Sequence, residues 1–360
     1  MTEPAAPDPV NWSVAEAVAA RVAGREPLAE SYHYDSLGPD FEEFTARAEE
    51  IVAEVTGLRS LVGPARARVT DRRGWINANI ASFRRLLKPV TERLAPKLAE
   101  SPLAPVTRSI AGAQLGTMLG WMSGRVLGQY DLLVVEDADT ENQDLVYYVG
   151  PNVLAIEKRF GFPPREFRLW LALHELTHRA QFTGVPWLRP HFLSLVDGAL
   201  GSVDPDPKRF VEALKRAVDQ MRSGENPLDD GGLVSLLAGP EQYAVLQQIG
   251  GMMSLLEGHG DITMNRAAEG IVPSADRFHR ALHARRNEQP GPAKLLQKLI
   301  GLEAKLKQYE QGERFIEAVE AEGGRELFDR VWEGPDFLPS LPEIRDPDLW
   351  IGRINSPVTV

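Results

Sequence analysis

The sequence has no cysteine among its 360 residues. A disulfide framework and a thiolate metal site are therefore both excluded, and any metal must be held by His, Asp or Glu. Basic residues are also in the minority, with 40 Lys and Arg against 51 Asp and Glu and a formal net charge of −11. Because no long stretch concentrates Lys and Arg, the charge pattern argues against a nucleic-acid-binding protein.

The N-terminal residues MTEPAAPDPVNW lack a basic region followed by an apolar core. They do not resemble a signal peptide, so a cytoplasmic location is the default expectation. Residues 1–10 are expected to be disordered because they are polar and Pro-rich.

Long hydrophobic runs are absent as well. The uncharged stretch from Ile110 to Gly124 has about 15 residues, fewer than the roughly 20 that cross a bilayer. Glycine recurs every four residues from Gly112 to Gly128, which on a helix makes a bare stripe where another backbone can approach. We predict a buried core helix here, rather than a membrane-dimerisation face, and no stable membrane insertion.

The overall balance, with 43% hydrophobic and 25% charged residues, is that of a globular protein. Apolar periodicity predicts successive amphipathic helices up to about Leu98, for example over 41–56 and 73–87. We expect an N-terminal helical region, 11–105, packed on a core formed by 106–355. The alternative is one continuous domain over 11–355.

The period then changes to that of strands. Residues 130–135 and 145–149 are rich in β-branched and aromatic side chains, and the acidic linker EDADTENQD separates them. They predict two strands of a small sheet, for which a hairpin with a long loop is one arrangement. Helices are predicted from Pro163–Pro164 through Phe182, over 240–268 and within 293–331, followed by an irregular Pro-rich end that Trp350 and Ile351 pack onto the core. The predicted fold class is α+β and mainly helical.

The string HELTH supplies His174, Glu175 and His178. Residues four apart lie on the same face of a helix, so both imidazoles can reach one metal ion. Glu175 points to a different side, where it can act as general base toward a metal-bound water. His174 and His178 continue an apolar stripe of the helix, which favours a metal pocket over the alternative of two hydrogen-bonded core histidines.

A catalytic zinc ion usually has three protein ligands and one open position. Glu257, in the apolar string LLEGHGDITM, is the candidate third ligand, because a buried carboxylate needs a cation or another partner. The alternative is a hydrogen-bond donor elsewhere or an ion pair with an arginine such as Arg266. Asp261, one turn further on, is placed to accept a hydrogen bond from a ligand imidazole.

His259 faces away from Glu257 on a regular helix. It is a candidate for stabilising an oxyanion, but a packed or surface histidine is the more favoured interpretation.

These motifs resemble the gluzincin arrangement of zincin metallopeptidases, in which HExxH is followed by a Glu-x-x-x-Asp helix. More specifically, the chain resembles an actinobacterial zincin-like metallopeptidase family associated with biosynthesis of the deazaflavin coenzyme. The matching strings include RRGWINANIASFRRLL, VGPNVLAIE, FRLWLALHELTHRAQFTGVPWLRPHF and LLEGHGDITM, within about 11–354. The resemblance implies a zincin-like core, zinc on His174, His178 and Glu257, and Glu175 as base. It also implies a strand along the substrate cleft, for which 145–149 is the candidate.

The sequence thus predicts an enzyme with one zinc ion per chain, a hydrolase of the metallopeptidase type that cleaves a peptide or small amide substrate. Glu175 would assist attack by zinc-bound water and pass the proton to the leaving amine. The alternatives are a non-catalytic zincin-like protein that binds a peptide or partner, and a zinc hydrolase acting on a small molecule.

Overall fold

The computed structural model describes residues 8–26, 28, 30–88, 91–92, 102–132, 144–201, 240–287 and 302–356. The expected disorder of 1–10 falls mostly on residues outside these ranges. The same is true of positions 133–135 of the first predicted strand.

The elements of the described residues are, in chain order, α1 (Trp12–Ala23), η1 (Tyr34–Ser36), α2 (Leu37–Thr56), β1 (Arg66–Thr70), α3 (Arg72–Leu86), α5 (Ala104–Ser123), β2 (Gly128–Tyr130), β3 (Leu145–Val149), α6 (Gly150–Phe160), α7 (Pro164–Gly184), α8 (Leu188–Gly201), α11 (Pro240–Ala268), α12 (Ala275–Asn287), α14 (Leu302–Asp329), η3 (Arg330–Trp332), η4 (Pro335–Phe337), α15 (Leu341–Arg345) and α16 (Pro347–Asn355). The fold is therefore mainly helical with one small sheet, as the sequence predicts.

Contacts divide the chain into two compact units. One comprises Met1–Ala180 with Ala267–Phe278, and the other comprises Gln181–Arg266 with His279–Val360. The last turn of α7, from Gln181 to Gly184, therefore belongs to the same unit as most of α11.

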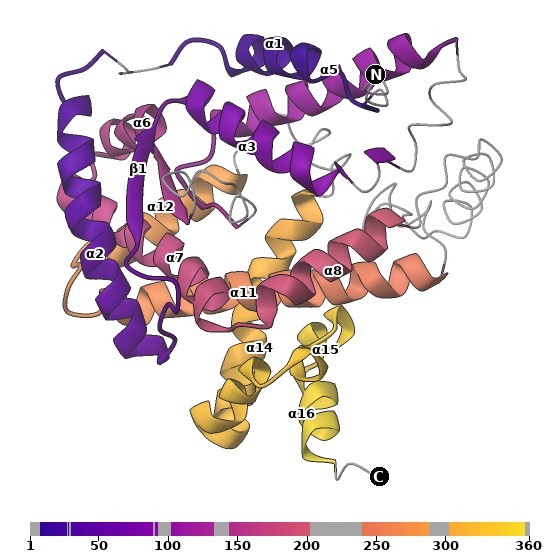
Figure 1. Cartoon of the computed structure of the whole chain (residues 1–360). Helices are drawn as coiled ribbons and strands as arrows, with labels where there is room; N and C mark the ends of the chain where they lie inside the picture. Colours follow the sequence, from indigo (N-terminus) through magenta and orange to yellow (C-terminus); the bar gives the residue numbers. More distant parts are fainter. Residues whose placement is uncertain are drawn as a thin grey trace. The chain divides into compact units, whose positions relative to one another are not determined.

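The sheet of the first unit has three strands in the order β1-β3-β2. β1 runs parallel to β3, and β2 runs antiparallel to it, so the sheet is mixed. β3 is buried along its whole length. Tyr148 of β3 stacks on Phe41 of α2, which covers one face of the sheet, with ring centroids 3.8 Å apart; Figure 1 shows β1 and α2 side by side.

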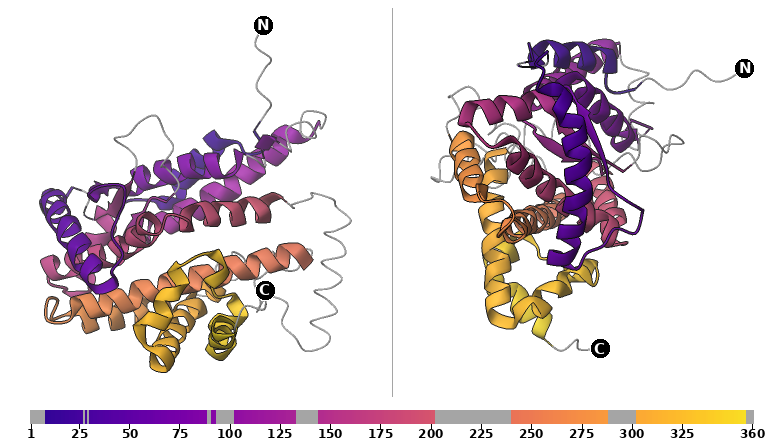
Figure 2. Two further views of the ribbon diagram at one scale, coloured as in Figure 1. Left: turned by 60° about the horizontal axis from the view of Figure 1, so that its bottom comes forward. Right: turned by 90° about the vertical axis from the view of Figure 1, so that its left-hand side faces the viewer.

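Helix α5 contains most of the glycine stripe, and α1 packs along it (Figure 1 and Figure 2). A Cβ placed on Gly112, Gly116 or Gly120 would lie 2.3, 2.3 or 2.5 Å from a backbone oxygen of α1 or its N-cap, Asn11. The close approach confirms a packed core helix. The stripe does not continue as one helix, however, because α5 ends at Ser123 and Gly128 lies in β2.

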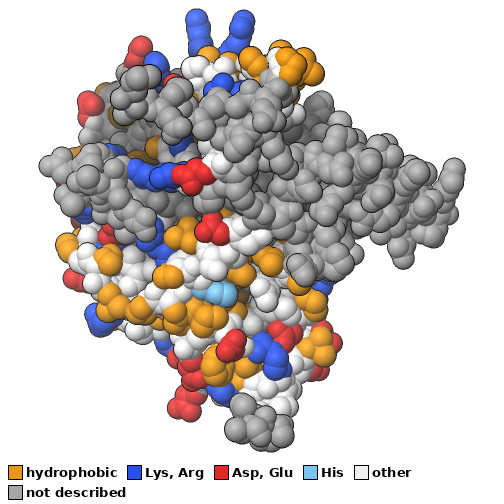
Figure 3. Space-filling model, turned by 45° about the vertical axis from the view of Figure 1, so that its right-hand side comes forward, with side chains coloured by type: hydrophobic (Ala, Val, Ile, Leu, Met, Phe, Trp, Pro, Cys, Tyr) orange, Lys and Arg blue, Asp and Glu red, His pale blue; other side chains and the backbone are white. Residues whose placement is uncertain are grey.

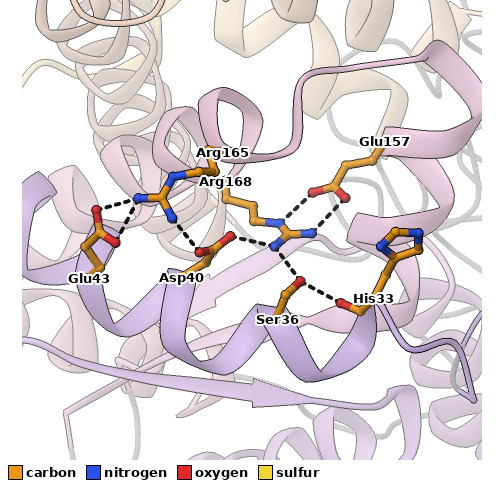
Figure 4. A network of polar contacts seen from close by, with 7 residues as sticks. All are labelled: His33, Ser36, Asp40, Glu43, Glu157, Arg165 and Arg168. Carbon is orange, nitrogen blue, oxygen red and sulfur yellow. Dashed lines mark hydrogen bonds and ion pairs between the residues drawn. The ribbon is translucent and has the colours of Figure 1, made fainter.

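Arginines fix α7 within the first unit. Figure 4 shows Arg168 donating to Glu157 of α6 at 2.8 Å and to Asp40 of α2 at 2.7 Å, while Arg165 binds Asp40 and Glu43. Three turns further on, the buried Arg179 pairs with Asp144, at 3.0 Å from its Nε, and with Glu49. Because Arg168 and Arg179 are eleven residues apart, they lie on the same face of the helix.

The second unit has its own core, around which α14, α15 and α16 gather (Figure 1). Trp350 of α16 is fully buried and donates its indole N–H to the Phe337 carbonyl at 2.8 Å. The core members are Leu255, Ile262, Phe315, Ile316, Val319, Phe328, Val331, Ile344 and Trp350. The prediction that the C-terminal segment packs on the core is confirmed.

Three local predictions are wrong. β1 lies where the sequence predicts only helices, because its alternation is only five residues long and has just two apolar members, Ala67 and Val69. The strand expected from Tyr130 instead begins at Gly128 and ends at Tyr130. The Pro-rich end is not irregular, since Pro342 and Pro347 stand in the first turns of α15 and α16, where proline costs no hydrogen bond.

None of the described helices is both long and apolar enough to cross a bilayer. On the face drawn in Figure 3, acidic and basic side chains of the described residues are intermixed and do not form a field of one sign.

Candidate metal centre

Helix α7 presents the HELTH residues on two faces. Successive residues are rotated by about 100°, so Glu175 falls on the same face as Arg168 and Arg179, whereas His174 and His178 lie on another. The two histidines are half-buried and Glu175 is 5% exposed. The sequence prediction that the glutamate points away from the imidazole pair is thus met by the helix itself.

The two imidazoles converge. Nε2 of His178 lies 3.3 Å from Nε2 of His174, and the ring planes are nearly perpendicular, at 88°. Two nitrogens that each lie about 2.0–2.1 Å from one zinc ion at a tetrahedral angle are about 3.3–3.4 Å apart. The pair therefore fits two ligands of one ion. An N–H···N hydrogen bond between the rings is the alternative explanation of the same distance.

Glu257, on α11, supplies a third donor. One ligand atom from each of His174, His178 and Glu257 lies within 4.8 Å of the other two, and all three residues are half-buried. Two imidazoles and a carboxylate form a donor set typical of catalytic zinc. The chain has no cysteine, so it offers no ligands to a metal that requires thiolates. Imidazole and carboxylate ligands suit zinc.

Glu175 is held against the edge strand of the sheet. The backbone N–H of Tyr130 in β2 donates to Glu175 Oε2 at 3.2 Å. A Cβ placed on Gly128 would lie 2.6 Å from Oε1 and 2.7 Å from Cγ of Glu175, so the missing side chain is what makes room for the carboxylate. The hydrogen bond orients the carboxylate through one oxygen, a geometry suited to a base that transfers protons through the other.

This contact corrects the expectation about the cleft strand. β3, residues 145–149, is the central strand with a neighbour on each side, so it has no edge to offer. The strand that meets Glu175 is β2. The sequence favoured β3 because it precedes the HELTH helix more closely than the other predicted strand.

The phenol of Tyr148 lies close enough to Glu175 to interact with its charge. Burial is the main cause that raises the pKa of Tyr148 far above its usual range, and the Glu175 carboxylate adds to the increase. A hydrogen bond of 2.8 Å with the Thr45 hydroxyl opposes these effects without cancelling them. Tyr148 therefore remains a neutral phenol at every pH at which the fold is intact.

The remaining predicted residues both lie on α11. Asp261 is 5% exposed and one turn beyond Glu257. His259 is buried between aromatic rings, with centroids 5.7 Å from Phe328 and 5.2 Å from Trp332. It is a packed side chain and not a surface histidine.

Sequence reasoning missed three contributors. Gly128 and Tyr130 shape the position of Glu175, and Gln181 contacts α11 on either side of Glu257. The only sequence signal for Gln181 is its place three residues after His178, which puts it one turn along the same helix.

In a comparison with known proteins, a family model described as zincin-like metallopeptidase matches residues 10–351. The chain belongs to the zincin-like metallopeptidase family. A crystal structure from Chloroflexus aurantiacus, titled as a proposed hydrolase with a novel fold, is similar, at 30% identity and a TM-score of 0.69.

The similarity to the Chloroflexus aurantiacus protein covers 97% of this chain and 99% of that one. Among proteins with curated descriptions, none matches. The chain carries an HExxH motif as His174–Glu175–Leu176–Thr177–His178 on α7.

Proposed function

We propose that this zincin-like protein is a zinc-dependent hydrolase that cleaves amide bonds, with one zinc ion held by His174, His178 and Glu257. The observation that carries the proposal is the convergence of these three donors beside a carboxylate, Glu175, that is oriented by a backbone N–H. A metal held only for stability would need no such base next to its ligands.

Zinc bound there would supply Lewis acidity, which lowers the pKa of a water molecule and polarises a substrate carbonyl. Glu175 acts as the proton carrier. Its Oε2 is kept in place by Tyr130, and its other oxygen accepts a proton from the attacking water and returns it to the leaving amine. Burial of Glu175 keeps bulk water from competing for this proton.

Asp261 has a supporting role in this proposal. As the acceptor for the outer N–H of a ligand imidazole, it would fix the ring orientation and raise the basicity of the ligand nitrogen. The substrate is a peptide or a small amide. We also propose that the chain belongs to the actinobacterial family associated with deazaflavin-coenzyme biosynthesis. That association does not identify the substrate.

Metal analysis of the purified chain tests the ligand set. We expect about one zinc per chain in the wild type and background levels in the double variant His174→Ala, His178→Ala. Zinc added to the metal-free wild type should raise the melting temperature, because a ligand that binds only the folded state stabilises it. His33→Ala, which removes an exposed histidine of the same unit, is the control and should keep the metal. Retention of zinc by the double variant would refute the site.

Glu175→Gln tests the chemistry separately from the metal. This variant keeps the size of the side chain and should keep the zinc, but its turnover of a peptide identified from a library should fall by about 10²–10⁴-fold. Unchanged turnover would exclude Glu175 as the base. Zinc retention in a wild type that hydrolyses no amide in the library would favour the non-catalytic, peptide-binding alternative.

A further inference from the structure

A single glutamine joins the helix of the two histidines to the helix of Glu257. Gln181 is fully buried in the last turn of α7. Its Nε2 donates to the Leu256 carbonyl at 2.9 Å and lies 3.0 Å from Nδ1 of His259. These contacts fall within the second unit, to which Gln181, Leu256 and His259 all belong.

The amide orientation follows from its partners. The Leu256 carbonyl can only accept a hydrogen bond, so the amide nitrogen of Gln181 must face it. The second N–H of that nitrogen is then directed to Nδ1 of His259, which makes Nδ1 an acceptor and places the ring proton on Nε2. Both N–H groups of the amide are thereby used on α11.

The positions of these contacts give them their significance. Leu256 and His259 stand on either side of Glu257, while Gln181 is one turn beyond His178 on a continuous helix. A fork of two hydrogen bonds fixes both the translation and the rotation of α11 at this point, which a single bond does not. The ring of His259 is itself immobilised between Phe328 and Trp332.

We propose that Gln181 and His259 are positioning residues that hold Glu257 in register with the histidine ligands of α7. They touch neither metal nor substrate and act through the two helices. The inference rests on the proposed metal site, and it assigns to His259 a role in place of the oxyanion contact that the sequence left open. Residues that orient the metal ligands without binding the metal typically contribute 10–100-fold to metal affinity.

The test is the zinc affinity of the full chain, measured by competition with a chromophoric chelator. Gln181→Met keeps the size of the side chain and removes both donors, and it should weaken zinc binding by about 10–100-fold. Glu343→Gln is the control. It weakens other hydrogen bonds of the same unit, from Arg353 and Ser340 to Glu343 at 2.6 and 2.7 Å, which join α15 to α16 and involve neither Gln181 nor His259. Its zinc affinity should stay within about twofold of the wild type, although both variants should melt at lower temperature.

A spectroscopic signature separates positioning from stability. With Co²⁺ in place of zinc, the visible absorption bands of Gln181→Met should shift because the ligand geometry changes, while those of Glu343→Gln should match the wild type. If Gln181→Met fails to fold, His259→Phe provides the same test, since it keeps a ring between the aromatic neighbours and loses the acceptor.

The outcomes are distinct. A wild type that binds no zinc overturns both this inference and the proposed function. A wild type that binds zinc, with Gln181→Met or His259→Phe equal to the Glu343→Gln control in affinity and in Co²⁺ spectrum, overturns the positioning role alone. Weakened affinity with shifted bands supports it.

Discussion

At the scale of single residues, the position of Glu175 depends on a glycine. Gly128 and Tyr130 are the ends of β2, and both adjoin Glu175. Gly128 makes room for the glutamate because it lacks a Cβ, and Tyr130 donates its backbone N–H to the carboxylate. The two contacts together explain how a carboxylate that is 5% exposed finds room and a partner beside the sheet.

Gly128→Ala should therefore displace Glu175. The added Cβ would come within 2.8 Å of three atoms of the glutamate side chain, which must move and give up its bond to Tyr130. We expect turnover to fall by at least about tenfold and the Tyr130 amide to exchange hydrogen faster, with a loss of about 1–3 kcal/mol in the free energy of unfolding. The matched control is Gly38→Ala in α2, where a Cβ has no neighbour within 4 Å. Wild-type exchange and turnover in Gly128→Ala would contradict this account.

At the scale of elements, the first unit relies on one very close helix pair. α1 and α5 approach until a Cβ on Gly116 would lie 2.3 Å from the Ala15 carbonyl oxygen. Such an approach gains dispersion contacts along both backbones, which offsets the helix-destabilising effect of repeated glycine.

Gly116→Ala should force these helices apart. The clash is with backbone and cannot be relieved by a rotamer change, so the free energy of unfolding should fall by about 1–3 kcal/mol or more, measured by urea titration. Gly352→Ala, on α16 with no atom within 4 Å of its Cβ, should be neutral or slightly stabilising. Equal stabilities for the two variants would show that α1 and α5 are not packed through this stripe.

At the scale of the whole molecule, ionised side chains contribute to the stability of the fold, which must therefore depend on pH. Burial by itself raises the pKa of Glu343, but hydrogen bonds from Arg353 and from Ser340 outweigh it, and the net pKa is lowered. Arg353 Nε lies 2.6 Å from Oε1, and the Ser340 backbone N–H lies 2.7 Å from Oε2. Glu343 thereby joins α15 to α16 near the C-terminus.

Glu343→Gln should lower the free energy of unfolding at pH 7 by about 1–3 kcal/mol, the range for hydrogen bonds to charged groups. A carboxyl with a lowered pKa in the folded state stabilises it fully above the unfolded pKa, near 4.3, and loses this contribution as pH falls through the folded value. The difference between variant and wild type should thus shrink below about pH 4. Glu42→Gln, exposed on α2, is the control and should stay within about 0.5 kcal/mol. A difference that is independent of pH would contradict the assignment.

Much of the architecture was predictable because it is local. The helices α2, α3 and α11 follow from apolar periodicity, and α7 begins at Pro164 as the proline pair indicates. β1 escaped prediction because its strand character comes from pairing with β3, about 80 residues away, and not from its own side chains. Sequence separation hides such a contact from any local pattern.

The candidate site, too, was predictable from the sequence mainly where its residues are close together in the chain. The sequence by itself determined that His174 and His178 share one face of a helix with Glu175 on another, because residues 174, 175 and 178 are related by the geometry of one helix. It also singled out Glu257 as a carboxylate in an apolar helix. Only the tertiary structure decided which strand contacts Glu175. It also decided that Gln181 hydrogen-bonds to residues of α11 on both sides of Glu257. Those contacts join segments whose proximity depends on packing, and packing is a property of the whole chain.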